Sequence, residues 1–185
     1  MENIIIIDDF FCVEHKKIIK DTIKNELWQA SFMENKNNFI INNFVKPNNT
    51  YNAHNGDFPF WRIELENNEF FSNVLKNVIE EKMKKTLSLD RLYAVSQNYE
   101  QVSNFHTDCD KGDFLTFCYY INDIENEEYD GYFYVKLPNN NTIISITPKD
   151  NRAVCFPSTY LHRGSGFNKN CNKLRICVAW KFKTN

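Results

Sequence analysis

The sequence predicts an α+β fold in which a β-sandwich or barrel carries helices on one side. Two observations support this prediction. The first part of the chain contains two segments whose apolar residues recur at helical spacing. From residue 90 onward the apolar residues alternate with polar ones, and clusters of Gly, Pro, Asn and Asp separate the alternating segments. Two helices followed by a series of strands are typical of an α+β domain.

The N-terminal region, about residues 1–89, is expected to support the β region. Its predicted elements are a β-branched strand at 3–7, a helix from Val13 to Trp28, a short strand at 39–41 and a helix from about Glu69 to Lys85. Cys12 occupies the N-cap position of the first helix. The Asn-rich residues 34–59 show no sustained period and are expected to be irregular around the strand at 39–41.

The remaining part, about residues 90–185, is predicted to form the β core. Its expected strands are residues 90–98, 103–109, 114–121, 131–137, 142–147, 152–156, 159–163 and 173–182. A chain of 185 residues is the length of one domain and can bury a core without disulfides, so we expect residues 1–185 to form a single domain.

Composition excludes several classes of protein. Aromatic residues make up 15% of the chain, which excludes global disorder, and the net charge of −2 gives no indication of nucleic-acid binding. The longest aliphatic run, residues 4–7, is too short for a membrane span or a signal peptide. Six cysteines without a C-x-x-C pair are typical of a reducing compartment, and a cytoplasmic location is expected.

Charge is unevenly distributed over the β region. Residues 100–130 contain nine acidic residues and one basic residue, whereas residues 151–185 contain seven basic residues and no acidic one. Two solvated faces would account for this pattern. The alternative is that one end of the barrel carries anionic metal ligands and that a late strand binds an anion.

His106-Thr107-Asp108 is the first candidate metal-binding motif. Residues i and i+2 of a strand point to the same face, so this imidazole and carboxylate converge. Two imidazoles and one carboxylate bind Fe(II) on one octahedral face and leave three positions open. His15 lies on the first helix and His54 in a polar loop, so His162 is the remaining strand histidine; by itself it could equally be a core residue.

Five motifs in order resemble the Fe(II)/2-oxoglutarate-dependent oxygenases of the prolyl 4-hydroxylase-like group. They are HTD (106–108), TFCYYIND (116–123), DGYFYV (130–135), TPKDNRAVCFPSTYLH (147–162) and LRICVAWKF (174–182). The N-terminal IIIIDDFFCVEHKKII also resembles the opening of many members, and residues 32–66 are the least recognisable part. The resemblance implies a double-stranded β-helix, that is, a cupin-like jelly-roll core, with the N-terminal helices packed on one sheet.

The resemblance also implies roles for individual residues. His106, Asp108 and His162 would be the catalytic metal ligands, and Arg175 would bind the distal carboxylate of 2-oxoglutarate. Tyr119 would reach the same carboxylate, although it could instead be a core aromatic residue. Tyr99 would contact the cosubstrate from the other side. These six residues are His106, Asp108, His162, Arg175, Tyr119 and Tyr99.

The implied activity is hydroxylation of a C–H bond, with Fe(II), 2-oxoglutarate, O2 and, as an accessory, ascorbate, and with release of succinate and CO2. Asp108 favours hydroxylation, because halogenating relatives replace this carboxylate with a small residue that admits chloride. The substrate is expected to be a peptidyl proline or a small molecule, with no nucleic-acid or membrane partner. The sequence does not define the oligomeric state or a role for the acidic segment 123–130.

The chain departs from the family pattern in three places. Asp130 replaces a glycine before Gly131, and Asn151 stands in a turn where glycine is usual, although Asn tolerates the same left-handed conformation. Trp180 has the opposite strand parity to Arg175, so it is predicted to lie in the core and not in the substrate pocket.

Two other functions compete with the oxygenase. One is a non-oxygenase jelly-roll that binds zinc through the same His106, Asp108 and His162, for which Arg175 would be dispensable. The other is a catalytically silent binding module, which would be expected to have lost a ligand of the triad.

Overall fold

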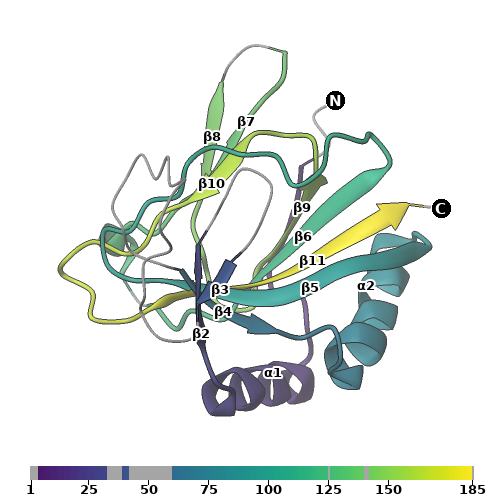
Figure 1. Cartoon of the computed structure of the whole chain (residues 1–185), viewed down its shortest axis with the longest axis horizontal. Coiled ribbons are helices and arrows are strands. Elements are labelled where there is room, and N and C mark those ends of the chain that lie inside the picture. The colour runs from purple at the N-terminus through teal and green to yellow at the C-terminus, as the bar shows by residue number, and fades with distance from the viewer. Residues whose placement is uncertain (1–3, 33–38, 42–59, 125, 140–141, 185) are drawn as a thin grey trace.

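Figure 1 shows a computed structural model of the chain, which describes residues 4–32, 39–41, 60–124, 126–139 and 142–184. The described strands form two sheets. The larger sheet has the strand order β1-β9-β6-β11-β5-β4-β2-β3, and the smaller has the order β10-β7-β8. All pairings between named strands are antiparallel. Two antiparallel sheets of this kind form the jelly-roll core that the resemblance implies.

The N-terminal elements are β1 (Ile5–Ile7), α1 (Val13–Asn25), β2 (Gln29–Phe32), β3 (Phe39–Ile41), β4 (Phe60–Glu64), the π-helical segment η1 (Phe70–Leu75) and α2 (Lys76–Met83). The remaining elements are β5 (Leu87–Gln97), β6 (Phe114–Tyr120), the 3-10 turn η2 (Glu127–Tyr129), β7 (Phe133–Lys136), β8 (Ile143–Ile146), β9 (Ala153–Pro157), β10 (His162–Gly164) and β11 (Arg175–Thr184).

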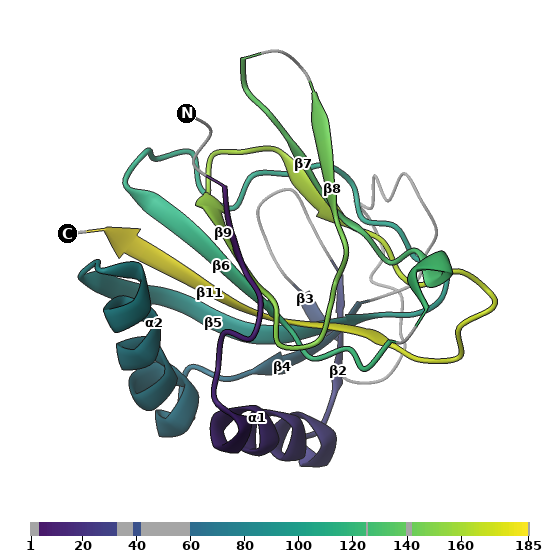
Figure 2. The ribbon, with the colours of Figure 1, turned by 180° about the vertical axis from the view of Figure 1, so that it is seen from behind.

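The helices cover the outer face of the larger sheet, on the side away from the smaller sheet (Figures 1 and 2). The core between helices and sheet contains Ile19 and Ile23 of α1, Phe71 of η1, and Phe117 and Trp180 of the sheet. Trp180 is fully buried there, and its indole N–H donates to the carbonyl of Phe71 over 3.1 Å. The prediction that Trp180 is a core residue is therefore confirmed.

A second, smaller core lies between the two sheets. Its members are Cys118, Tyr120, Phe133, Val135, Ile146, Val154, Phe156, Cys177 and Ala179. Because successive residues of a strand face opposite sides, Ala179 and Cys177 of β11 belong to this core whereas Val178 and Trp180 belong to the other.

Asn151 connects the N-terminal segment to the turn before β9. It adopts the left-handed conformation expected for this position, with φ 60°. Its side-chain oxygen accepts from the backbone N–H of Phe11, and its amide donates to the carbonyl of Phe11, each over 2.9 Å. Asparagine thus supplies both the turn conformation and two buried hydrogen bonds, which glycine could not.

Several predicted elements differ from the structure. β2 and β4 were not predicted, because QASF and FWRIE are only four and five residues long and give too short a pattern to identify a strand. The predicted strand 103–109 is wrong: this segment is extended but makes only isolated bridges, at Val102 and His106. Its backbone bonds to Ser158, His162 and Gly164 instead of forming a continuous ladder.

The buried stripes of the helices are narrower than predicted. Val13 and Leu27 are 81% and 85% exposed, because Val13 is the first residue of α1 and Leu27 lies beyond its end at Asn25. Cys12 caps α1 as expected, and its Sγ accepts from the N–H of His15. All six cysteines are free. No helix in the described ranges has the length and apolar character needed to cross a membrane.

Candidate active site

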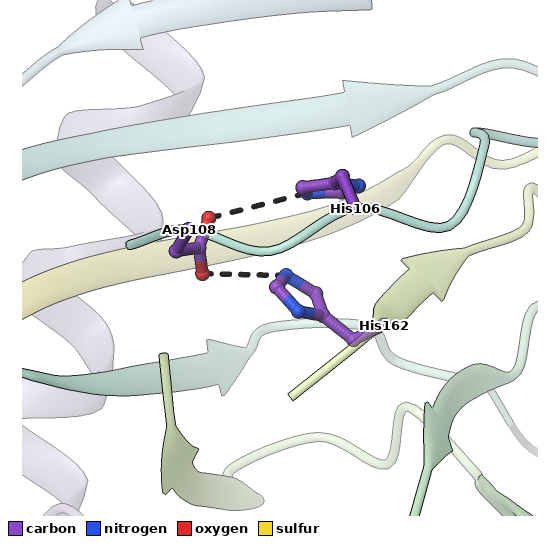
Figure 3. Close-up of side chains that lie close together, drawn as sticks. All are labelled: His106, Asp108 and His162. Atoms are coloured by element: carbon purple, nitrogen blue, oxygen red, sulfur yellow. Dashed lines mark ion pairs between the residues drawn. The ribbon is translucent and has the colours of Figure 1, made fainter. Parts of the chain in front are cut away.

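His106, Asp108 and His162 converge on one point between the two sheets (Figure 3). His106 and Asp108 lie on the segment that joins β5 to β6, and His162 is the first residue of β10. Their nearest ligand atoms all lie within 4.8 Å of one another. Nε2 of His106 is 4.0 Å from Oδ1 of Asp108, and Nε2 of His162 is 3.2 Å from Oδ2. The structure therefore brings together the three residues that the sequence proposed as metal ligands.

Both histidine rings are oriented by the backbone. Nδ1 of His106 lies 2.9 Å from the carbonyl oxygen of Asn104, and Nδ1 of His162 lies 2.9 Å from that of Tyr160. A carbonyl can only accept, so each Nδ1 carries the proton and each Nε2 presents its lone pair to the centre. Burial of the ring and the neighbouring His162 lower the pKa of His106 to about 4, which keeps it neutral and able to bind a metal near pH 7.

Asp108 is held through one of its two oxygens. Oδ2 accepts hydrogen bonds from the hydroxyl of Thr116, over 2.6 Å, and from the ammonium of Lys181. The backbone N–H of Asp108 donates to the carbonyl of Ser158. Burial alone would raise the pKa of Asp108, but the charge and hydrogen bond of Lys181, together with the adjacent His162, lower it well below its usual value. The carboxylate is therefore ionised, and among the described residues hydrogen bonds from Thr116 and Lys181 reach Oδ2 and not Oδ1.

The three residues lie in the wall of a cavity of about 600 Å³ between the two sheets. The side chain of His106 is 28% exposed, whereas those of Asp108 and His162 are 6% and 5% exposed. The candidate metal centre is thus reached from the His106 side and is shielded from water on the other two. Such partial enclosure is typical of small-molecule sites.

Arg175 lies elsewhere in the same cavity and is 3% exposed. Its Nε donates to the carbonyl of Gly131 over 2.7 Å, and its Nη1 donates to Oε1 of Gln97 over 3.0 Å. Within the described part of the chain its Nη2 is buried without a hydrogen-bond partner. A buried guanidinium that two neutral acceptors orient, and that keeps a free donor, is suited to binding a carboxylate.

Gly131 is required where it makes this contact. Its φ of 72° is in the left-handed region, and a Cβ atom there would lie 2.3 Å from the ring of Phe167. The family-like Gly131 therefore places its carbonyl oxygen against Arg175, whereas Asp130 before it adopts a left-handed φ of 59° without being glycine.

Tyr119 does not reach the cavity, contrary to the sequence expectation. Its hydroxyl donates to Oδ1 of Asn151 over 2.9 Å in the core on the helix side. Tyr120 lines the cavity instead, and Arg175 lies over its ring at 5.2 Å. The register explains the shift by one residue: Tyr120 is paired with Cys177, on the face of β11 that carries Arg175, whereas Tyr119 is paired with Val178.

Tyr99 also lies outside the cavity, in a turn after β5, and is 64% exposed. The residue from this region that faces Arg175 is Gln97, which is 4% exposed and directly opposite Arg175 in the β5–β11 pairing. His54 lies outside the described residues.

Lys181 is the site residue that the sequence prediction missed. It is 3% exposed and touches Asp108 from β11. The signal was present, because a lysine flanked by Trp180 and Phe182 in an apolar strand must face the side opposite to those two core residues.

Comparison with known proteins agrees with this geometry. Residues 93–180 match the sequence profile of the 2OG-Fe(II) oxygenase superfamily, and the matched region contains all three converging residues and Arg175. The match spans just under half of the chain, which resembles this superfamily there. No curated protein sequence matches the chain.

Solved structures with the same fold share little sequence with this chain. A prolyl hydroxylase from Trichoplax adhaerens, solved with a peptide fragment of the hypoxia inducible factor oxygen degradation domain, has 13% identity and a TM-score of 0.68. The match covers 99% of this chain and 84% of that one. A prolyl-4-hydroxylase from Pseudomonas putida has 9% identity and a TM-score of 0.65, over 100% and 94% of the two chains.

A third structure is HygX from Streptomyces hygroscopicus with nickel and 2-oxoglutarate bound. It has 11% identity and a TM-score of 0.67, over 98% of this chain and 83% of that one. These likenesses confirm the predicted double-stranded β-helix with helices on one sheet.

Proposed function

We propose that the protein is a 2-oxoglutarate-dependent oxygenase that binds Fe(II) through His106, Asp108 and His162 and hydroxylates a C–H bond of a peptide or a small molecule. The observation that carries the proposal is the convergence of two Nε2 atoms and one ionised carboxylate within 4.8 Å, with both Nδ1 atoms bound to backbone carbonyls. This donor set fits Fe(II) with open positions for other ligands.

The residues around the metal ligands hold them in place. Thr116 and Lys181 bind Oδ2 of Asp108, which leaves Oδ1 toward His106. The N–H and carbonyl groups of His106 and His162 bond reciprocally, so the two ligand-bearing segments are tied together independently of a metal. Such preorganisation lowers the cost of ordering the site when a metal binds.

We assign Arg175 and Tyr120 to the distal carboxylate of 2-oxoglutarate. The unpaired Nη2 of Arg175 and the hydroxyl of Tyr120 are both buried in the described structure without hydrogen-bond partners, and a carboxylate would satisfy both. Gln97 and Gly131 fix the plane of the guanidinium. Iron and 2-oxoglutarate, when bound, would allow O2 to oxidise the C–H bond, with one oxygen atom entering the substrate, the other entering succinate, and CO2 released.

The substrate class rests on the fold relatives. The Trichoplax adhaerens prolyl hydroxylase is in complex with a peptide fragment, and a second HygX structure has hygromycin B bound, which is a small molecule. A peptidyl proline or a small molecule is therefore the substrate we propose. We also propose a reducing, cytoplasmic location, because free cysteines such as Cys118 and Cys177 line the cavity.

The decisive test is an anaerobic titration of the apoprotein with Fe(II) and 2-oxoglutarate. We expect a weak visible metal-to-ligand charge-transfer band that requires both components, because the keto acid chelates the metal. Fe(II) alone and 2-oxoglutarate alone are the controls. If no band forms while zinc binds tightly, the chain is the non-oxygenase zinc protein.

Tyr119 and Tyr120 offer a matched pair of variants. Tyr120→Phe should weaken 2-oxoglutarate binding by about tenfold, since it removes one hydrogen bond to a charged group. Tyr119→Phe should leave that affinity unchanged and should lower the free energy of unfolding by about 1 kcal/mol, since it removes the buried hydrogen bond to Asn151. Charge-transfer titration and urea unfolding measure the two effects. The opposite pattern would restore Tyr119 as the cosubstrate contact.

A further inference from the structure

The cavity carries more positive than negative side chains. Among its described lining residues are four cations and two carboxylates: Arg62, Arg91, Arg175, Lys181, Asp108 and Asp110. Arg175 is accounted for by the cosubstrate in the proposed function. The remaining three cations have no part in binding 2-oxoglutarate.

Two of these cations face each other across paired strands. Lys181 of β11 is directly opposite Arg91 of β5, so their side chains share one face of the sheet. Like charges in this position repel. The segment carrying Asp108 lies over them: the carboxylate contacts the Lys181 ammonium, and the Asp108 carbonyl accepts from Arg91 over 2.9 Å. The Asp108 carboxylate thus compensates Lys181, whereas Arg91 pairs with Asp90, whose Oδ2 lies 3.1 Å from the Arg91 Nε and whose side chain is 43% exposed.

The third cation, Arg62, extends the cluster onto β4. Its guanidinium lies 3.9 Å from the centre of the Tyr93 ring, and the Lys181 ammonium lies 5.7 Å from the same ring. Glu64, the ion-pair partner of Arg62, is 41% exposed. A carboxylate that faces water in this way is screened and neutralises the cavity side of its partner only weakly.

The cluster is distant from the cosubstrate cation. Arg175 and Lys181 are six residues apart in β11, which separates their Cα atoms by about 20 Å. A molecule of 2-oxoglutarate that spans from the metal ligands to Arg175 therefore extends away from Lys181. The cluster therefore faces the part of the cavity that lies on the side of the metal ligands away from Arg175.

We propose that Lys181, Arg91 and Arg62 form an anion subsite, and that the substrate of the oxygenase carries a carboxylate or phosphate group. This inference rests on the proposed function. Once a divalent metal shares the charge of Asp108, the cation cluster loses part of its compensation, and the anionic group of the substrate replaces it. The subsite places that group beside the metal ligands, so it would orient the neighbouring C–H bonds toward the reacting centre.

The test uses the protein loaded with Mn(II), which is paramagnetic, and with saturating 2-oxoglutarate to occupy Arg175. Inorganic phosphate is titrated, and its ³¹P relaxation measures binding near the metal; acetate labelled with ¹³C is the second probe. We expect at least one probe to bind, and the tighter of the two identifies the anionic group. Lys181→Met and Arg62→Met should each weaken binding about tenfold, and Lys181→Arg should restore it.

Arg163→Met is the matched control. Arg163 also stacks on aromatic rings, with its guanidinium 4.6 Å from the centre of Phe105, but it does not line the cavity. It should bind the probes as the wild type does. Arg62 touches no metal ligand in the described structure, so Arg62→Met decides the matter if Lys181→Met disturbs the metal.

The inference is overturned if neither anion binds, or if Arg62→Met and Lys181→Met bind them as the wild type does. In that case Lys181 serves only to hold Asp108. The affinities for Mn(II) and 2-oxoglutarate, measured on the same samples, distinguish failure of the anion subsite from failure of the proposed function. If these bind normally and the anions do not, the anion subsite falls and the proposed function stands; if they do not bind, both fall.

Discussion

Asp108→Ala is expected to abolish the decarboxylation of 2-oxoglutarate and to weaken Fe(II) binding by more than about 100-fold. Loss of a group that merely supports a ligand costs 10–100-fold in metal affinity, so loss of a ligand should exceed that range. Asp108 supplies the only carboxylate within reach of the two histidines in the described structure. Its removal also leaves the ammonium of Lys181 buried without its anion, which further repels a divalent cation.

The measurement is succinate formation together with an independent metal titration by Mn(II) EPR. Chloride must be absent from the buffer, because halogenating relatives bind chloride where this carboxylate is missing. Asp110→Asn is the matched control: Asp110 also lines the cavity, but its Oδ1 accepts only from the hydroxyl of Thr107, over 3.3 Å. Normal turnover by Asp108→Ala would exclude the triad as the iron site. His106→Ala should reproduce the loss.

The order of motifs made the convergence of His106, Asp108 and His162 predictable from the sequence. His106 and Asp108 are two residues apart, and His162 was the one remaining histidine in an apolar segment. The argument that His106 and Asp108 point to the same face of one strand was only partly right, because residues 103–109 are not a strand. The two side chains still converge, since the backbone of this segment bonds to His162 and Ser158 and keeps it extended.

The residues that surround Arg175 in the cavity were harder to predict because strand parity depends on register. The Tyr-Tyr run was recognised, but which tyrosine faces the cavity is decided by the pairing of β6 with β11. The same parity that correctly placed Trp180 in the core puts Lys181 on the cavity side together with Arg175. The sequence prediction did not include Lys181, because the family pattern on this strand concerned its neighbour Trp180.

The limits of the fold prediction have a similar cause. Alternating segments such as β6, β9 and β11 were found because one face of each is buried against another layer. The strands β2 and β4 extend the sheet beyond that region; they are only four and five residues long, and their pairing joins polar residues such as Gln29 and Arg62. Local pattern does not record such pairings, which depend on distant partners.

Arg175→Met is expected to weaken 2-oxoglutarate binding by about 100-fold while leaving Fe(II) binding intact. Hydrogen bonds to a charged group contribute about 1.5–3 kcal/mol, and the guanidinium would supply both its charge and a free donor to the carboxylate. Methionine fills the apolar volume of the buried arginine stem, so the variant should fold. The charge-transfer band, titrated with 2-oxoglutarate under argon, measures the affinity directly.

Pyruvate separates the distal carboxylate from the rest of the cosubstrate, since it keeps the keto-acid group but lacks that carboxylate. Wild type and Arg175→Met should bind pyruvate equally weakly. Only the wild type should bind 2-oxoglutarate more tightly than pyruvate. Arg175→Lys should recover part of that gain, because an ammonium keeps the charge but cannot bond to Gly131, Gln97 and a carboxylate in one plane. An unchanged 2-oxoglutarate affinity in Arg175→Met would move the anion site to another base, with Lys173 and Arg163 the first to test.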